Sequence, residues 1–338
     1  MGESRPLLAI TQGDPAGVGP EIIVKALRDP ELFALCRPLV IGDRRILKRA
    51  AGWLGNATPR FELVGADLNG ACLPGTIPLL DRANADPERV PPGKISMEAG
   101  RAAVAAVELA CDLALAGKVD AVVTAPLNKE AMNLAGFHFA GHTELLAERT
   151  GARRVSMLLT SPSLRVVHVS THVSLAEAIR RVTVERVLEV IELAHSSCLA
   201  LGVEQPRIAV AGLNPHASEG GLFGNEEATS VVPAIAAARA RGLHVSDPLP
   251  PDTVFLRAVR GEFDIVVAMY HDQGHIPMKL LAFESGVNVS MGLPIIRTSV
   301  DHGTAFDIAG TGRASEASLV AAIGVAVQMV RARRSGQP

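Results

Sequence analysis

The sequence predicts an α/β protein with mainly parallel sheets that are covered by helices on both faces. Two observations support this prediction. Short runs of aliphatic and β-branched residues alternate with longer amphipathic stretches, and the short runs are almost wholly apolar, as strands buried on both faces are. The chain has 338 residues, a length that suggests about two domains.

The expected elements alternate along the chain. Short apolar runs such as LLAIT predict strands at residues 7–11, 38–42, 119–126, 155–160, 165–170, 207–213 and 263–270. Apolar residues at helical spacing predict helices at residues 21–35, 97–116, 174–201, 225–241 and 315–334. Residues 56–92 are rich in Gly, Pro and Asp, so we interpret them as a long surface excursion.

Composition excludes several classes of protein. The 33 basic and 35 acidic side chains give a net charge of −2, without the basic excess of a nucleic-acid-binding surface. No apolar run approaches the roughly 18 residues of a membrane span. The N-terminal residues show no secretion signal, and Cys36, Cys72, Cys111 and Cys198 are widely spaced. We therefore expect a cytoplasmic protein with free thiols.

Polar clusters follow several predicted strands, where parallel sheets usually bind ligands. The first cluster is QGDPAGVGPE at residues 12–21. Its glycines permit tight backbone geometry, and Pro20 suits the first turn of a helix. This segment either presents backbone N–H groups to an anion or simply connects a strand to a helix.

Three histidines follow other predicted strands: His172, His216 and His271. Each could be a hydrogen-bonded structural residue, but three at one sheet edge could converge on a divalent cation. Imidazoles suit Zn, Co, Ni or Fe, whereas Mg would ask for carboxylates. Asp252 and Asp272 are candidate carboxylate neighbours of these histidines. The long separations between the histidines leave both interpretations open.

Two further groups have the chemistry to bind an anion. His142 and Thr143 precede an amphipathic helix, where Thr143 either caps the helix or donates to a substrate. Lys279, Asn288 and Arg297 lie in or beside apolar segments and suit a phosphate or carboxylate, unless they are separate surface groups.

These motifs together resemble the 4-hydroxythreonine-4-phosphate dehydrogenase family. The matching strings are QGDPAGVGPE, GHTE, GLNPHASEGG, YHDQGH and LPIIRTSVDHGTAFDIAG, in the family's order. The resemblance implies homodimers of two-domain α/β/α subunits with the active site at the dimer interface. It assigns the divalent metal to His172, His216 and His271, and substrate binding to His142, Thr143, Lys279, Asn288 and Arg297. We take His142, Lys279 and Asp252 as catalytic candidates.

Residues 300–315 also resemble the HGSAPDIAG stretch of isopropylmalate and isocitrate dehydrogenases, which belongs to their dinucleotide site. By this resemblance NAD or NADP would contact His302, Gly303, Thr304 and Asp307. The fold is then expected to be isopropylmalate/isocitrate dehydrogenase-like. Its first domain would comprise residues 1–127 and 290–338, and its second, with most metal and substrate residues, 128–289.

The family resemblance implies metal-dependent oxidation of the 3-hydroxyl of a 4-phosphorylated four-carbon hydroxy acid, followed by decarboxylation. In pyridoxine biosynthesis the substrate is 4-phosphohydroxy-L-threonine. The text QGHIPMKLLAFES resembles a second branch, in carbohydrate metabolism, that acts on 4-phospho-D-threonate or 4-phospho-D-erythronate, and we favour this branch. Alternatives are a dihydrodiol dehydrogenase of aromatic dicarboxylates and a phosphate acyltransferase-like enzyme.

Overall fold

The computed structural model describes residues 5–55, 59–65, 67–68, 70 and 72–336. The chain divides into two compact units, the first being Met1–Arg153 with Leu293–Val330 and the second Arg154–Gly292 with Arg331–Pro338. The α/β class with mostly parallel pairing is confirmed in both units. The four cysteines are free. Among the described residues, no helix has the length and apolar composition of a membrane span.

Unit 1 is built around parallel strands in the spatial order β3-β4-β2-β1-β5-β12. These strands are β1 (Leu7–Thr11), β2 (Arg37–Gly42), β3 (Arg60–Leu63), β4 (Thr76–Asp81), β5 (Ala121–Thr124) and β12 (Arg297–Val300). The helices are α1 (Gly19–Ala26), α2 (Pro30–Leu35), α3 (Arg44–Gly52), α4 (Met97–Leu115), α5 (Lys129–Leu134), α6 (His142–Thr150) and α12 (Ala317–Arg334). Strand β1 has β2 on one side and β5 on the other, so the loops after β1 and β5 leave from a switch point, where open α/β sheets bind ligands.

Unit 2 has strands in the order β11-β6-β7-β10-β8-β9. Its strands are β6 (Ser156–Thr160), β7 (Arg165–His168), β8 (Ile208–Ala211), β9 (Val245–Leu249), β10 (Ile265–Ala268) and β11 (Val287–Met291). Strand β6 pairs antiparallel with β7 and β11, and the pairs from β7 to β9 are parallel.

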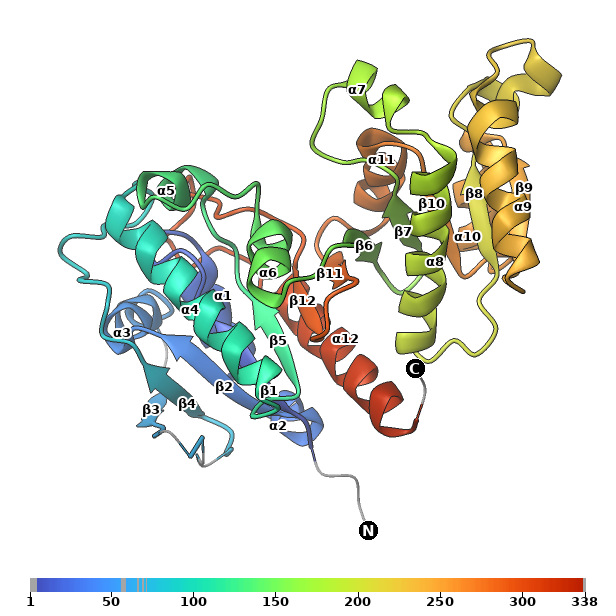
Figure 1. Cartoon of the computed structure of the whole chain (residues 1–338). Coiled ribbons are helices and arrows are strands. Elements are labelled where there is room, and N and C mark those ends of the chain that lie inside the picture. The colour runs from blue at the N-terminus through green and yellow to red at the C-terminus, as the bar shows by residue number, and fades with distance from the viewer. Residues whose placement is uncertain (1–4, 56–58, 66, 69, 71, 337–338) are drawn as a thin grey trace. The chain divides into compact units, whose positions relative to one another are not determined.

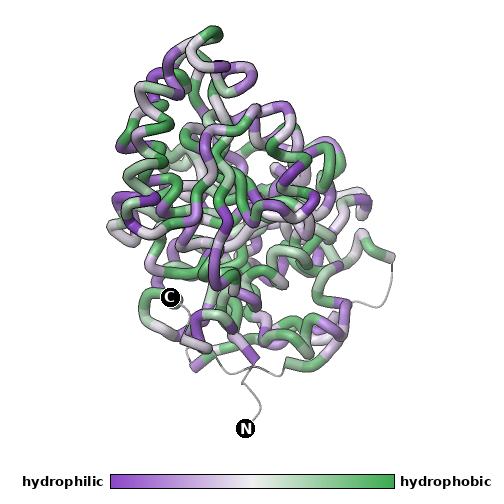
Figure 2. The backbone as a smooth tube through the Cα atoms, turned by 90° about the vertical axis from the view of Figure 1, so that its right-hand side faces the viewer, coloured by the Kyte–Doolittle hydropathy of each residue, from purple (hydrophilic) through white to green (hydrophobic). Residues whose placement is uncertain are grey.

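Helices cover the sheet of unit 2 on both faces, with α8 and α9 in front of it and α10 and α11 behind it in Figure 1. The helices are α7 (Leu175–Arg180), α8 (Val184–Ala200), α9 (Val232–Ala240), α10 (Pro251–Val259) and α11 (His271–Ala282), with the short turns η1 (Pro215–Gly221) and η2 (Glu227–Val231). Figure 2 shows hydrophobic and hydrophilic residues interspersed along the helices, as expected where one side packs on a sheet.

The structure divides the chain later than the expected boundary at residue 128. Met132 of α5 and Leu145 and Leu146 of α6 are buried in the core of unit 1, where they join Val104 and Val107 of α4. Residues 128–153 therefore belong to unit 1, because their apolar side chains are buried there.

The prediction of a surface excursion at residues 56–92 was wrong in part. Strands β3 and β4 lie within it and extend the parallel sheet beyond β2. Ile77 and Leu79 of β4 are fully buried, although the surrounding Gly, Pro and Asp residues masked this short apolar run. Residues 56–58, 66, 69 and 71 of the segment lie outside the described residues.

Two predicted helices are each divided by a cap. The expected helix at 21–35 is α1 and α2, because Asp29 caps α2 and Pro30 begins it. The expected helix at 174–201 is α7 and α8, where Thr183 accepts a hydrogen bond from the Arg186 amide. A capping side chain satisfies an amide that a continuous helix would bond to its own backbone. The elements α3, α5, α10, α11, β9, β11 and β12 were not predicted.

Candidate active site

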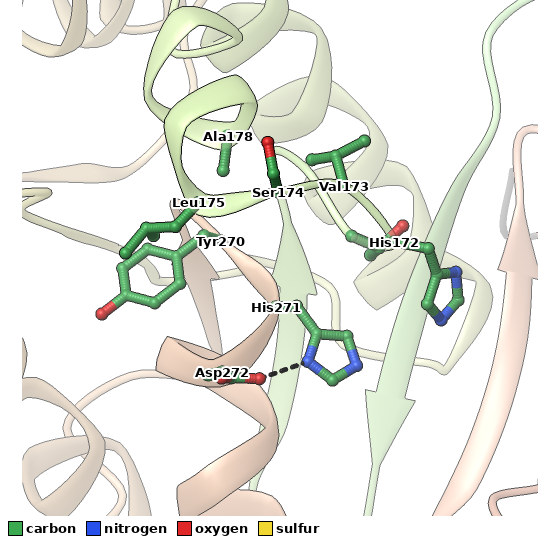
Figure 3. A pocket seen from close by; sticks show the side chains of 9 residues that line it. His172, Val173, Ser174, Leu175, Ala178, Tyr270, His271 and Asp272 are labelled. Atoms are coloured by element: carbon green, nitrogen blue, oxygen red, sulfur yellow. Dashed lines mark hydrogen bonds and ion pairs between the residues drawn. The ribbon is translucent and has the colours of Figure 1, made fainter.

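Two of the three histidines expected to bind a metal lie beside one pocket in unit 2. The parallel register pairs Ala268 of β10 with His168 of β7, so the segments after both strands leave the same sheet edge. His172 follows β7, His271 begins α11, and their ring centres are 5.6 Å apart. The pocket, of about 430 Å³, lies between residues 171–178 and 270–272. Figure 3 shows both imidazoles beside it.

The geometry of this pair fits a divalent ion. Two imidazoles on one tetrahedral ion have ring centres roughly 5 Å apart, because each metal–nitrogen bond is about 2 Å long. The Nδ1 atom of His271 lies 2.7 Å from Oδ1 of Asp272, the contact that Figure 3 marks with a dashed line. A carboxylate at one ring nitrogen fixes the tautomer that offers the other nitrogen to a metal. Asp272 is thus placed to orient His271.

The third expected ligand, His216, lies in η1, after β8. Its ring is 6.0 Å from that of Phe223, and its Nδ1 is 3.9 Å from Oε2 of Glu219. Asp252 is exposed in the first turn of α10, which packs against η1. Within the described part of the chain, no three His, Cys, Asp or Glu side chains are arranged to hold a metal ion. One chain therefore brings together two of the three histidines.

The loop that carries His216 is fixed by hydrogen bonds with Glu227 and Gln273, two residues that the sequence did not single out. The carboxylate of Glu227, 3% exposed, accepts hydrogen bonds from the backbone amides of Leu213 and Asn214, both 2.8 Å. Gln273 of α11 donates to the Gly212 carbonyl at 2.7 Å and accepts from the Met269 amide at 2.7 Å. The start of α11 and the loop after β8 are thus tied together. The polar residues in EEATS and HDQGH were the only sequence signal for this network.

Lys279 and Asn288 are also in unit 2. Lys279 follows His271 by eight residues on α11, close to the same helix face. Its Nζ lies 5.6 Å from the ring centre of Phe283. Asn288 is in β11, and its Oδ1 is buried without a hydrogen-bond partner. A buried, unsatisfied amide oxygen is costly, so Asn288 fits a role in binding a donor group.

The third expected anion-binding residue, Arg297, lies in unit 1 on β12. Its side chain is 2% exposed, and its Nη2 donates to Oγ1 of Thr124 at 2.6 Å. Burial lowers the pKa of Arg297 to about 9, and the nearby charge of Glu144 opposes that shift. The guanidinium is therefore charged at neutral pH, and a buried cation is suited to an anionic ligand.

His142 is the second predicted substrate residue in unit 1, at the start of α6. Its Nε2 atom is buried and has no hydrogen-bond partner. Burial, followed by the charges of Arg297 and Lys129, holds the pKa of His142 well below its usual range. A neutral imidazole at neutral pH can accept a proton or a hydrogen bond, as a general base must.

The interpretation of Thr143 as a helix cap was wrong. Helix α6 begins at His142, and Gly141 occupies the capping position without a side-chain hydrogen bond. Thr143 therefore lies in the first turn of α6, and its role as a substrate donor stays a prediction.

The loop after β1 connects a strand to a helix, and its backbone amides donate hydrogen bonds to other groups of the protein. Four amides of this loop donate to protein oxygens, namely those of Asp14, Ala16, Gly17 and Val18. Gly13 has φ +70°, and a Cβ there would lie 2.4 Å from the Pro126 carbonyl oxygen. These hydrogen bonds favour the plain strand-to-helix connection over an anion-binding loop.

The predicted cofactor residues pack against this loop. The Thr304 carbonyl accepts a hydrogen bond from the Val18 amide at 3.1 Å, and a Cβ at Gly17 would lie 2.9 Å from the Thr304 Cβ. His302 is partly exposed, whereas Gly303 and Asp307 are exposed. Residues 302–307 therefore form a surface segment that the loop after β1 supports.

Comparisons with known proteins identify the family. The model of the family described as "Pyridoxal phosphate biosynthetic protein PdxA" matches residues 34–326. The chain is 51% identical to a D-threonate 4-phosphate dehydrogenase from Cupriavidus necator, over 96% of this chain and 97% of that protein. It is also 51% identical to a 4-hydroxythreonine-4-phosphate dehydrogenase from Desulfosudis oleivorans, over 96% of each chain.

A solved structure gives the same result. The crystal structure of 4-hydroxythreonine-4-phosphate dehydrogenase from Klebsiella pneumoniae matches with a TM-score of 0.87 and 45% identity, covering 96% of this chain and 99% of that chain. Because the likeness extends over both units and nearly the whole of each relative, it cannot come from one shared motif. The chain belongs to the pyridoxal phosphate biosynthetic protein PdxA family and is an oxidoreductase of the dehydrogenase type.

Proposed function

We propose that the protein oxidises the 3-hydroxyl of a four-carbon hydroxy acid that carries a 4-phosphate, using NAD or NADP and a divalent metal, and that decarboxylation follows. The observation that carries this proposal is the 51% identity, over nearly full length, to dehydrogenases named for two such substrates. We favour 4-phospho-D-threonate or 4-phospho-D-erythronate over 4-phosphohydroxy-L-threonine. The text QGHIPMKLLAFES supports this choice.

The metal and the nicotinamide cofactor would supply the central chemistry: a Lewis acid that lowers the pKa of the alcohol, and an acceptor for its hydride. His172 and His271, with His216, would hold the ion, which could be Zn, Co, Ni, Fe or Mg. The nitrogen donors favour the transition metals over Mg.

The remaining residues bind and orient the substrate. Arg297, Lys279 and Asn288 would hold its phosphate or carboxylate, because a buried guanidinium gains an anionic partner in this way. The buried amide oxygen of Asn288 would accept a hydrogen bond from a substrate hydroxyl. Thr143 would donate a hydrogen bond. His142, neutral because of burial and neighbouring cations, would take the hydroxyl proton as hydride leaves carbon 3. Asp252 and Lys279 are the other acid–base candidates.

The dinucleotide would lie along residues 302–307, where His302, Gly303, Thr304 and Asp307 would contact it. Oxidation at carbon 3 gives a 3-keto acid, which then loses CO₂. We further propose that the protein works in the cytoplasm as a homodimer. Exposed apolar side chains of unit 2, such as Leu280 and Phe283, support the homodimer.

The test is spectrophotometric. Reduction of NAD or NADP is followed with 4-phospho-D-threonate, 4-phospho-D-erythronate and 4-phosphohydroxy-L-threonine, with the same metal, and kcat/KM is compared. A tenfold preference corresponds to about 1.4 kcal/mol of transition-state binding. A preference of that size for the amino acid would overturn the choice of branch. No cofactor reduction with any of the three would overturn the proposed function.

The two alternatives make different predictions in the same assay. A dihydrodiol dehydrogenase would reduce the cofactor only with the dihydrodiol of an aromatic dicarboxylate. A phosphate acyltransferase would reduce none and would need no metal. The variants His172→Ala and His271→Ala should each lose most of their bound metal and activity. The control variant Cys72→Ala, in unit 1, should lose neither.

A further inference from the structure

Unit 2 contains two histidines beside the proposed metal ligands that the proposed function does not use. His275 lies on α11 and His168 ends β7. The ring centre of His275 is 3.6 Å from that of His271 and 4.7 Å from that of His168. With His172, these side chains form a cluster of four imidazoles.

The sequence spacing explains the contact between His271 and His275. The two residues are four positions apart on a helix, so they lie on the same face, one turn from each other. Their rings are stacked, with an angle of 11° between the ring planes. The Nδ1 atom of His275 also lies 3.1 Å from the His271 carbonyl oxygen. The ring of His275 is therefore fixed to the helix backbone while it covers one face of His271.

His168 packs against α11 and, among the described residues, belongs to no group of three His, Cys, Asp or Glu side chains that could hold a metal ion. It is fully buried, and neither of its ring nitrogens has a partner with hydrogen-bond geometry. A Cβ at Gly274 would lie 2.3 Å from its Nε2. The backbone of α11 therefore passes close to that nitrogen, and only a glycine at position 274 leaves room for the His168 ring. This packing makes His168 a support for α11 and His275.

We propose that His275 is a positioning residue that fixes the orientation of His271 for metal binding. Asp272 holds Nδ1 of His271 at 2.7 Å, and the His275 ring restricts rotation of the His271 ring out of its plane. Together they leave Nε2 of His271 as the ligand atom. Preorganising a ligand in this way raises metal affinity because less side-chain freedom is lost on binding. This inference rests on the metal dependence in the proposed function.

The experiment measures metal binding without substrate or cofactor. Zinc affinity is determined by competition with a chelating indicator for metal-free wild type, His275→Leu and His275→Phe. We expect His275→Leu to weaken zinc binding about tenfold, the lower end of the effect of outer-shell changes. His275→Phe keeps an aromatic face on His271 and should retain most of the affinity. The visible spectrum of the Co²⁺ form should change for Leu and stay close to wild type for Phe.

The zinc-binding experiment includes a control variant, and the results that would overturn the two proposals differ from each other. His138→Leu removes an exposed histidine of unit 1 that contacts Asn133 and should leave zinc affinity unchanged. If His275→Leu does not fold, His275→Gln, which has no ring but can still donate to the His271 carbonyl, carries the same expectation. Wild-type affinity and Co²⁺ spectrum in the Leu or Gln variant would overturn the inference and leave the proposed function standing. Equal losses in Leu and Phe would also overturn it, and a wild type that binds no metal would overturn both proposals.

Discussion

His142 shows how burial and neighbouring charge set the chemistry of a single residue. The sequence identifies it only as a histidine before a helix. In unit 1 its Nε2 is buried, and the positive charges of Arg297 and Lys129 oppose its protonation. Both effects disfavour the imidazolium form. The residue therefore stays neutral to lower pH than an ordinary histidine, and a neutral imidazole can act as a proton acceptor at neutral pH.

We predict that Lys129→Met raises the pKa of His142. The substitution removes one of the positive charges that oppose protonation of the ring, so the imidazole gains a proton at higher pH. The acid limb of the kcat/KM profile should accordingly move to higher pH, and the His142 signal in NMR titration should move with it. Lys118→Met, on the turn after α4, is the control. A limb that stays in place or moves to lower pH contradicts the assignment of His142 as the base.

Asp14 shows the effect of burial on an acid. Its Oδ1 accepts a hydrogen bond from the Ala16 amide at 2.8 Å, while Oδ2 is buried without a partner. Burial raises the pKa of Asp14 to about 6. The folded state therefore favours the protonated acid, and stability that is present below about pH 4 is lost as the pH rises through 6.

We predict that Asp14→Asn gains stability relative to wild type as the pH rises. The amide keeps an acceptor for the Ala16 amide and cannot ionise. A shift of about two pKa units corresponds to roughly 3 kcal/mol, so the variant's free energy of unfolding minus that of wild type should rise by up to that amount between pH 4 and pH 8. Urea denaturation at both values measures it. A difference that is constant with pH would show that Asp14 does not titrate in this range.

At the scale of the element, the loop with His216 has a conformation that isolated residues would not adopt. The five residues from His216 to Gly220 have positive φ between 46° and 69°. For residues other than glycine this backbone conformation costs free energy. The hydrogen bonds from Leu213 and Asn214 to the buried carboxylate of Glu227 hold the start of the loop in place.

We predict that Glu227→Ala releases this loop. The substitution leaves two amides without their acceptor, at about 1–3 kcal/mol for each unsatisfied buried group. Hydrogen exchange at residues 213–221 should accelerate, and the protein should unfold at lower urea concentration. Glu227→Gln keeps one acceptor oxygen and should show a smaller effect. Unchanged exchange in the Ala variant would mean that other contacts hold the loop.

At the scale of the whole molecule, a homodimer would account for an apolar surface on α11 and at the residue that follows it. Ile276, Leu280 and Phe283 have exposed fractions of 59%, 81% and 73%, and their spacing places them on one side of the helix. Clustered apolar side chains at a surface are typical of protein interfaces. The histidines of α11 lie on a different part of the same helix, so dimerisation would involve the element that carries His271.

We predict that wild type sediments with the mass of two chains and that Leu280→Lys with Phe283→Lys shifts it toward one chain. Two lysines facing an apolar partner would have to lose hydration without ion pairs. Sedimentation velocity measures the mass. Leu134→Lys, which changes a 56% exposed leucine of unit 1, is the control and should remain dimeric. A monomeric wild type would refute the homodimer.

The sequence by itself determined the fold class and most of the buried strands, because uninterrupted apolar runs have few places other than the centre of a sheet. It also determined the family, since five motifs occur in order. Element boundaries were less determined. The starts of α2 and α8 depend on the capping side chains of Asp29 and Thr183, and β4 depends on a short apolar run. Each of these local signals is small beside the surrounding sequence pattern.

Only the tertiary structure decided how the candidate residues are grouped. Strand register brings His172 and His271 to one pocket, whereas the left-handed backbone of η1 gives His216 a separate setting. The pKa values of His142 and Asp14 and the stacking of His275 on His271 likewise depend on burial and on neighbours distant in the chain. Such effects arise from desolvation and packing over a few ångströms, and a sequence specifies these only through the completed fold.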